Sequence, residues 1–476
     1  MNYVIDKEPK SVFHFFEEIS QIPRGSGNEK AIADYLENFA KTRGLFCYRN
    51  DANDVFVRKP ASAGRENEPT ILFQAHTDMV CEKNEDVKHD FEKDPIEIYV
   101  DGNFLRARGT TLGADDGVGV ALMLAILNGD CGETPEVEAL FTTAEETGMD
   151  GVVAFDMSMI KARKLINLDS EDLDQIVVGC AGGLTCEVNF TGELKRTAEC
   201  GYKVTINGLA GGHSGNDINL GRSNANKLMG RILLSLGDRI KLASLNGGGK
   251  TNAIPRECSA VIVSADKNIV SDIKAAADII AKELSADDRN FAVKIEKCDA
   301  SECFDGDFTK RVIGFLSTAE NGVVEMSKKI KGFVEYSRNL GVIRTNGNQI
   351  TFTLFDRSAI DAQLDYDELK NKALADAFGG KYTFKSRSGG WNYREDSTVR
   401  EDWLKACQKI MPNLPMQVLT IHAGLECGYF IAKIPDMDII SVGPTLLDIH
   451  SPDEKLVIDT VEPFFKVLCE VLNQRK

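Results

Sequence analysis

Seven residues whose side chains bind metals or move protons are scattered over this chain of 476 residues. Imidazole and carboxylate groups in such a set are typical of sites for divalent metal ions. Two such ions held close together activate water for hydrolysis. The sequence therefore predicts a hydrolase that uses metal-bound water. The seven residues are His76, Asp78, Asp115, Glu145, Glu146, Asp169 and His450.

The acidic pairs have an ordinary explanation when each is considered alone. Asp115 and Asp116 precede an apolar helical segment, where carboxylates serve as N-capping groups. Glu145 and Glu146 would most often form a solvated surface pair. Adjacent side chains at a strand end diverge, however, so one of the two can bind metal while the other moves protons.

His76 and Asp78 alternate with Thr77 along a strand, so both project to the same side. A carboxylate in that place can hold one ring nitrogen while the other nitrogen binds metal. The pair alone would also suit a strand end without metal. A metal site is favoured by the whole set, because each member follows a buried strand or begins a helix in a chain with only 6 histidines.

Charge balance agrees with two ions. Three carboxylates, Asp115, Glu146 and Asp169, together with one bridging hydroxide would cancel the charge of two divalent cations. A set with imidazole and carboxylate but no thiolate favours Zn²⁺, with Mn²⁺ or Co²⁺ as substitutes.

The first part of the chain alternates helix and strand. Residues 28–43 have a helical apolar face and 118–127 form an apolar helix. Short apolar runs at 70–75, 137–143 and 164–168 predict buried strands. This order predicts an α/β sheet with its chemistry at the strand ends.

The middle of the chain follows a different order. From about Cys186 it reads strand, helix, strand, strand, helix, strand, and a second pass of similar order follows, so we expect an α+β lid domain with internal duplication. From about Gly390 the α/β pattern returns, and that segment carries His450. The predicted domains are a catalytic domain formed by residues 1–185 and 390–476 and an inserted lid domain formed by 186–389.

Composition excludes several classes of protein. The formal charge of −17 disfavours nucleic acid and anionic membranes as partners. The sequence contains no apolar stretch long enough to span a bilayer and no pattern of a secretory signal. Its 12 cysteines lack CxxC pairs, so we expect free thiols in a reducing compartment. These features predict a cytoplasmic protein.

Seven motifs carry a resemblance to a known family. The strings HTDMV, LGADDGVGVA, TTAEETGMDG, INLDSED, GGHSGNDI, HAGLECG and GPTLLDIHSP resemble those of the bacterial aminoacyl-histidine dipeptidases. These enzymes are also called Xaa-His or cytosol non-specific dipeptidases, and they are aminoacylase-like di-zinc metallopeptidases. The resemblance spans nearly the whole chain. It implies a mixed-sheet catalytic domain with an inserted lid, and hydrolysis of unblocked dipeptides, including Xaa-His dipeptides such as carnosine.

The resemblance also implies the ligand sets. His76, Asp115 and Asp169 would hold one ion. Asp115, Glu146 and His450 would hold the other, with Asp115 as the bridge. One departure is visible, because many relatives have Asn where this chain has Asp116.

The resemblance further implies three catalytic groups. Asp78 would orient His76. Glu145 would act as general base, taking a proton from the bridging water and giving one to the leaving amine. His213, in the Gly-Gly-His-Ser-Gly string, would stabilise the oxyanion from the lid. A polar histidine in a glycine-rich turn is the alternative for His213.

Three residues are candidates for contacts with the substrate. Arg357 resembles an arginine that clasps the substrate carboxylate, for which a guanidinium fork is suited; a surface arginine is the alternative. Asn252 is a further candidate. Glu426, in the His-Ala-Gly-Leu-Glu string, would meet the substrate amine.

Other functions remain open at this point. The same site would serve a tripeptidase, a carboxypeptidase or an N-acyl amino acid deacylase. A catalytically silent interaction protein with the same fold is the rival from another class. The expected partner is a small peptide, and the sequence leaves open whether the chain acts as a homodimer or His213 reaches the site within one chain.

Overall fold

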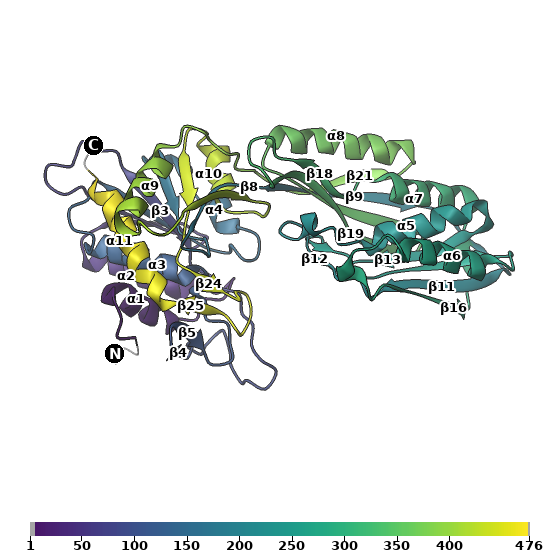
Figure 1. Cartoon of the computed structure of the whole chain (residues 1–476), viewed down its shortest axis with the longest axis horizontal. Helices are drawn as coiled ribbons and strands as arrows, with labels where there is room; N and C mark the ends of the chain where they lie inside the picture. The colour runs from purple at the N-terminus through teal and green to yellow at the C-terminus, as the bar shows by residue number, and fades with distance from the viewer. Residues whose placement is uncertain (1–4, 475–476) are drawn as a thin grey trace. The chain divides into compact units, whose positions relative to one another are not determined.

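The computed structural model of the protein describes residues 5–474, which form two compact units (Figure 1). Unit 1 comprises the described residues up to Gly179, the segment Tyr393–Thr420, and the described residues from Glu426 onward. Unit 2 comprises Cys180–Asn392 and Ile421–Leu425.

Unit 1 is built on an eight-stranded mixed sheet with the order β1-β2-β6-β3-β7-β23-β8-β22. Its central strands β6, β3, β7 and β23 run parallel to one another. All residues of β3 and β6 are buried, as expected for strands covered on both faces. The strands are β1 (Phe46–Arg49), β2 (Val55–Lys59), β3 (Ile71–His76), β6 (Val137–Thr142), β7 (Lys164–Asn167), β8 (Gln175–Cys180), β22 (Gln417–Ile421) and β23 (Asp438–Ser441).

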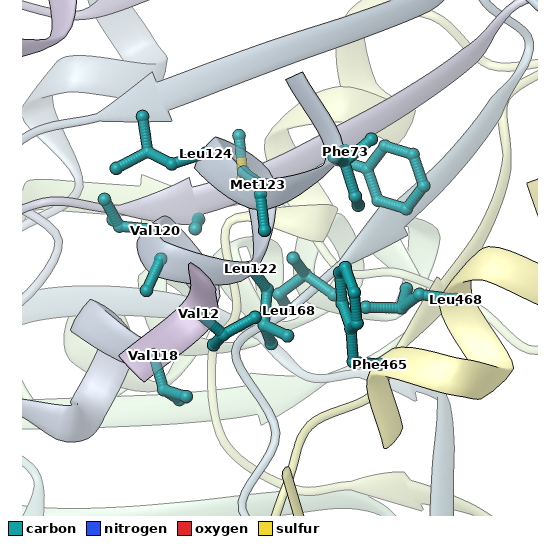
Figure 2. Packing of buried hydrophobic residues seen from close by; sticks show 14 of the residues in the cluster. Val12, Phe73, Val118, Val120, Leu122, Met123, Leu124, Leu168, Phe465 and Leu468 are labelled. Atoms are coloured by element: carbon teal, nitrogen blue, oxygen red, sulfur yellow. The ribbon is translucent and has the colours of Figure 1, made fainter. Parts of the chain in front are cut away.

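Helix α3 (Ala114–Asn128) lies in the core of this unit. Every residue from Asp116 to Leu127 is buried, which explains why its sequence is apolar on all sides. It shares one hydrophobic cluster with residues of β3, α1 (Lys10–Ser20), α2 (Lys30–Thr42), α9 (Thr398–Ile410) and α11 (Val461–Asn473), and Figure 2 shows part of that cluster. The unit also contains the short helices α4 (Asp150–Ala154) and α10 (Cys427–Lys433).

A small sheet with the order β24-β25-β5-β4 completes unit 1. Its strands are β4 (Ile98–Asp101), β5 (Phe104–Ala107), β24 (Leu446–Leu447) and β25 (Lys455–Val457).

A disulfide joins Cys131, which follows α3, to Cys469 in α11. The prediction that all cysteines are free thiols is wrong for this pair, whereas the other ten, all within residues 5–474, are not in a disulfide. The two residues are 338 positions apart, and spacing along the chain carries no information about a contact of that range.

Unit 2 is built on an antiparallel nine-stranded sheet with the order β16-β11-β15-β13-β19-β20-β9-β21, in which β18 also pairs with β19. The helices are α5 (Ala225–Leu236), α6 (Ile269–Ala281), α7 (Gly306–Thr318) and α8 (Asp361–Ala377). The strands are β9 (Gly182–Thr191), β11 (Cys200–Asn207), β13 (Lys241–Gly247), β15 (Cys258–Ser264), β16 (Ala292–Cys298), β18 (Gly322–Met326), β19 (Val334–Asn346), β20 (Gln349–Ser358) and β21 (Lys381–Ser388). Two short antiparallel pairs are separate from this sheet, namely β10 (Leu194–Arg196) with β17 (Glu302–Phe304) and β12 (Gly212–His213) with β14 (Ala253–Ile254).

Strand β20 shows which face of this sheet is covered. Ile350, Phe352 and Leu354 belong to the hydrophobic cluster that also contains residues of α5, α6, α7 and α8. Because side chains alternate along a strand, Arg357 projects from the opposite face. Its cross-strand partner in β19 is Ser337.

The structure confirms the predicted α/β fold class and most of the expected elements, including α2, α3, β3, β6 and β7. The sequence pattern did not predict the long strand β9 as one element. Internal duplication and the domain boundaries stay predictions. Among the helices of residues 5–474, none is long and apolar enough to cross a membrane.

Candidate active site

The parallel direction of β3, β6 and β7 brings several candidate residues to one edge of the unit 1 sheet. His76 is the last residue of β3, Glu145 and Glu146 follow β6, and Asp169 follows β7. Carboxyl ends of parallel strands are the usual place for a site in open α/β sheets. Asp115 joins them from the first turn of α3.

Asp115 lies between two imidazoles. Its Oδ1 is 3.1 Å from His76 Nε2, and its Oδ2 is 3.0 Å from His450 Nε2. Asp169 Oδ1 is 3.6 Å from His76 Nε2, and Glu146 Oε1 is 3.0 Å from His450 Nε2. The five side chains therefore form two sets that share one carboxylate.

Among residues 5–474, three combinations of donor atoms lie close enough together to hold a metal ion. Asp115, Glu146 and His450 each offer an atom within 4.8 Å of the others. A second combination within that distance contains His76 and Asp169 with Asp116 rather than Asp115, and a third contains His76, Glu145 and Glu146.

The carboxylate of Asp116 is already engaged with the backbone. It accepts hydrogen bonds from the N–H of His76 at 3.3 Å and of Gly119 at 3.2 Å. Burial and the nearby charge of Asp169 raise the pKa of Asp116 well above its usual range. Asp116 is thus a capping group, and its raised pKa reduces the negative charge that it brings to the cluster.

Crowding of the acidic groups shifts their protonation. Burial, with the charges of Asp115 and Glu146, raises the pKa of Asp169 to about 6. Burial also raises the pKa of Glu145 well above its usual range, to which Asp169 and Glu146 add. Hydrogen bonds to Asp115 and Glu146 raise the pKa of His450 to about 11. This excess of negative charge is what divalent cations would neutralise.

The backbone carbonyl of Asp78, more than its carboxylate, orients the ring of His76. Its Nδ1 is 3.1 Å from the carbonyl oxygen of Asp78 and 3.5 Å from the carboxylate Oδ1. A proton on Nδ1 leaves the lone pair of Nε2 directed toward Asp115. Burial opposes a proton on His76, but hydrogen bonds to Asp115, Asp169 and Asp78 raise its pKa well above the usual value.

The carboxylate of Asp78 has a second role that the sequence did not indicate. It accepts hydrogen bonds from the backbone N–H of Glu145 at 3.1 Å and of Glu146 at 3.2 Å, and from the Ser26 hydroxyl at 2.7 Å. Asp78 therefore fixes the turn that presents both glutamates.

Glu426 is fully enclosed, with 0% of its surface exposed. One carboxylate oxygen accepts hydrogen bonds from Gln74 at 2.5 Å and Thr142 at 2.7 Å. The other oxygen, Oε1, has no hydrogen-bond partner among residues 5–474. Burial raises the pKa of Glu426 to about 8.

In unit 2, Arg357 is a buried cation with no acidic partner among residues 5–474. Only 6% of it is exposed, and its neighbours are the ring of Phe355 at 4.4 Å and the Ser214 hydroxyl at 3.4 Å from Nε. No carboxylate pairs with it in the part of the chain that the structure describes. Its Nη2 lies 3.4 Å from His213 Nε2.

The contacts of His213 indicate which ring nitrogen carries the proton. Nδ1 accepts hydrogen bonds from the backbone N–H of Gly215 at 3.3 Å and of Asn216 at 3.2 Å. Burial and the charge of Arg357 lower the pKa of His213, so the ring is neutral at neutral pH. Two backbone donors on Nδ1 outweigh the single 3.4 Å contact of Arg357 with Nε2, which favours the proton on Nε2. The N–H of His213 and the guanidinium of Arg357 are then two adjacent donors, which suits a shared anion.

Asn252 lies in the same neighbourhood of unit 2. Its carbonyl accepts a hydrogen bond from the N–H of Ser214 at 2.9 Å. The side chain of Asn339 donates to the carbonyls on either side, those of Thr251 and Ala253, each at 2.8 Å. The Asn252 loop is therefore fixed next to the segment that carries His213.

His422 belongs to this group, although the sequence pattern did not single it out. Its Nε2 is 2.6 Å from the hydroxyl of Ser337, the cross-strand partner of Arg357. Burial, with the charges of Arg357 and His213, lowers the pKa of His422 to about 3. Its place in the His-Ala-Gly-Leu-Glu string was the one available signal.

Comparison with known proteins defines the class. The model of Peptidase family M20/M25/M40 matches residues 72–474, so the chain is a peptidase. It belongs to Peptidase family M20/M25/M40. The predicted resemblance and the predicted enzyme class, a peptide hydrolase, are confirmed.

Two relatives match the full length. The chain is 37% identical over 486 residues to the cytosol non-specific dipeptidase of Escherichia coli (strain K12), covering 100% of this chain and 99% of the relative. The crystal structure of aminoacylhistidine dipeptidase from Vibrio alginolyticus matches with a TM-score of 0.90 and 35% identity, covering 100% and 99% of the two chains. An M20 family metallo-carboxypeptidase from Sulfolobus solfataricus, with a TM-score of 0.55, 17% identity and coverage of 97% and 98%, shares the fold.

Proposed function

We propose that this peptidase is a metal-dependent dipeptidase of the cytosol, with two divalent ions in unit 1 and a site for the free carboxylate of the substrate in unit 2. The observation that carries the proposal is Asp115, whose two oxygens face His76 and His450 at 3.1 and 3.0 Å. The two full-length relatives are both named dipeptidases, which supports the substrate class.

The donor set fits two ions. His76, Asp115 and Asp169 would hold one, and Asp115, Glu146 and His450 the other. Nitrogen and oxygen ligands without a thiolate favour Zn²⁺ over softer metals, and Mn²⁺ or Co²⁺ would be accepted as substitutes. Bound there, the ions would lower the pKa of a water molecule and polarise the peptide carbonyl.

We assign proton transfer to Glu145. Hydrogen bonds from its own N–H and that of Glu146 to Asp78 fix the turn that presents its carboxylate. Burial raises the pKa of Glu145, and neighbouring positive charge would lower it again toward neutrality, the range that suits a general base. Glu145 would take a proton from the attacking water and return it to the leaving amine.

Recognition of the substrate is assigned to unit 2. Arg357 can grip a carboxylate with two parallel hydrogen bonds, and the Nε2–H of His213 adds a neighbouring donor. Stabilisation of the oxyanion by His213, a substrate contact of Asn252, and a contact between Glu426 and the substrate amine stay predictions. For Glu426 the unpartnered Oε1 is the atom available, among the residues that the structure describes.

A substrate panel tests the proposal. The metal-loaded protein should hydrolyse Ala-His and other unblocked dipeptides, and should act weakly on Ala-Ala-Ala, on N-acetyl amino acids and on dipeptide amides. Metal analysis should find two ions per chain. A preference for the tripeptide or for N-acetyl substrates would contradict the dipeptidase assignment, and absence of turnover with both ions bound would contradict hydrolysis.

A further inference from the structure

Glu454 accepts several hydrogen bonds from the turn that carries Asp115, although the proposed function gives Glu454 no role. Its Oε2 accepts hydrogen bonds from the N–H of Leu112 at 2.7 Å and of Gly113 at 2.9 Å. Its Oε1 accepts from Ala114 at 2.8 Å and from Asp115 at 3.2 Å. Only 2% of Glu454 is exposed. One carboxylate thus satisfies four consecutive backbone donors at the start of α3.

The capping group within α3, Asp116, accepts the N–H groups of Gly119 and His76, so it does not serve the N–H groups of residues 112–115. The first N–H groups of a helix have no partner within the helix and normally bind a nearby side chain. Here the N-cap is Gly113, which has no side chain and a left-handed φ of 69°. A Cβ at Gly113 would lie 2.7 Å from both Arg24 Nη2 and Met79 Sδ. The left-handed φ favours glycine at this position, and the N–H groups of residues 112–115 are bound by Glu454 instead.

Arg24 holds the same turn from its carbonyl side. Its guanidinium donates to the carbonyl of Gly113 and, at 3.0 Å, to the carbonyl of Thr77 next to His76. Arg24 is only 2% exposed, so two buried groups of opposite charge fix the turn. Neither residue was indicated by the sequence motifs.

Glu454 also belongs to the loop that carries His450. The N–H of Glu454 donates to the carbonyl of Ser451 at 3.0 Å, which closes a tight turn directly after His450. One side chain therefore ties the loop of His450 to the turn of Asp115. Asp115 and His450 both belong to the ligand set that also contains Glu146. The other ligand set, with His76 and Asp169, contains Asp115 but not His450.

We propose that Glu454 is a positioning residue, which fixes the positions of Asp115 and His450 relative to each other before a metal ion binds. Its removal then weakens both metal sites, and it weakens the site formed by Asp115, Glu146 and His450 more strongly. This inference rests on the proposed function.

The variant Glu454→Gln tests it, because the amide keeps the shape but turns an NH₂ group toward two of the four backbone donors. Changing a group that orients metal ligands commonly costs roughly 10- to 100-fold in metal affinity. We expect a loss in this range for the second Zn²⁺ or Co²⁺ ion and a smaller loss for the first. At saturating metal, kcat should recover toward the parent value while KM for a dipeptide stays unchanged.

Glu138→Gln is the matched control. Glu138 has 0% exposure and its carboxylate also accepts backbone hydrogen bonds, from Lys161 and Ala162 at 3.1 Å. It lies near the start of β6, away from the strand ends that carry the ligands. The control should lower the melting temperature of the metal-free protein but bind both ions as the parent does.

The outcomes separate the two proposals. Parent-like affinity for both ions in Glu454→Gln, or an equal loss in Glu138→Gln, overturns the positioning role alone. A parent protein that binds fewer than two ions overturns the proposed function and this inference with it. If Glu454→Gln does not fold, Glu454→Asp is judged by the same affinity measurement, because it keeps the charge but shortens the reach to the four donors.

Discussion

The two clusters of functional side chains carry unbalanced charge of opposite sign. In unit 1, Asp115, Glu146 and Asp169 lie around two imidazoles. Burial, with the charges of Asp115 and Glu146, raises the pKa of Asp169 to about 6. In unit 2, Arg357 is buried beside His213 and His422 with no carboxylate paired to it among the described residues. A buried charge without a partner is costly. We therefore expect each cluster to be completed by a ligand, cations in unit 1 and an anion in unit 2.

The clusters also differ in how firmly their charged groups are fixed. Asp78 in unit 1 accepts two backbone N–H groups, and Glu454 accepts four. Arg357 contacts only the Ser214 hydroxyl and His213 Nε2, each at 3.4 Å, and the ring of Phe355, among the interactions found for residues 5–474. Metal ligands have to be placed accurately before the ions bind. An arginine that waits for a carboxylate has to keep its donors free.

The largest effect should come from Asp115→Ala, which removes the carboxylate shared by both ligand sets. We expect loss of at least one ion and a fall in turnover greater than that for any other single ligand. The stabilisation that metal gives to the folded state should shrink as well, because a ligand that binds only the folded protein raises its melting temperature. Metal content and melting curves with and without Zn²⁺ measure this. Two ions per chain in the variant would place the bridge elsewhere.

Glu145→Gln should separate metal binding from proton transfer. The amide preserves the shape but cannot accept a proton from water, and loss of a general base commonly lowers the rate roughly 10²- to 10⁴-fold. Both ions should remain bound. Metal content and kcat should be measured on the same sample, and near-normal turnover with two ions would refute the assignment of Glu145.

Arg357→Lys tests the unit 2 side of the comparison. Lysine keeps the charge but loses the fork, so binding of a dipeptide should weaken by about 1.5 to 3 kcal/mol. Hydrolysis of the dipeptide amide, which lacks the carboxylate, should hardly change. Arg231→Lys is a control in the same unit, because Arg231 is exposed and pairs with Glu283. Equal losses of kcat/KM on the dipeptide and its amide would make Arg357 a structural residue.

The smallest expected effect is the contribution of His422 to the pH dependence of stability. Its folded pKa of about 3 lies below the ordinary value of 6.5, so between these values the unfolded chain binds a proton that the folded protein does not. Stability should therefore fall as pH decreases from 6.5 toward 3, with His422 contributing a slope of about 1.4 kcal/mol per pH unit. This slope is measured by the free energy of urea unfolding at pH 7 and pH 5, determined for unit 2 within the whole protein in the parent and in His422→Asn. The idea is wrong if the two proteins lose the same stability over this range.

The sequence by itself determined the parts of the protein that depend on local pattern. Apolar runs located β3, β6 and β7 to within a few residues, because burial on both faces requires continuous apolar side chains. The order of helices and strands indicated parallel strands, and parallel strands place their carboxyl ends at one edge. For this reason the sequence pattern is sufficient to predict that His76 and Asp169 lie close together.

The tertiary structure alone decided the contacts between distant segments. The bonds from Glu454 to residues 112–115 span about 340 positions, and the disulfide of Cys131 with Cys469 spans 338. His422 joins Arg357 only because residues 421–425 return to unit 2. Periodicity reports which side of its own element a residue faces. It holds no information on which remote segment packs there, and that choice follows from the packing of the whole chain.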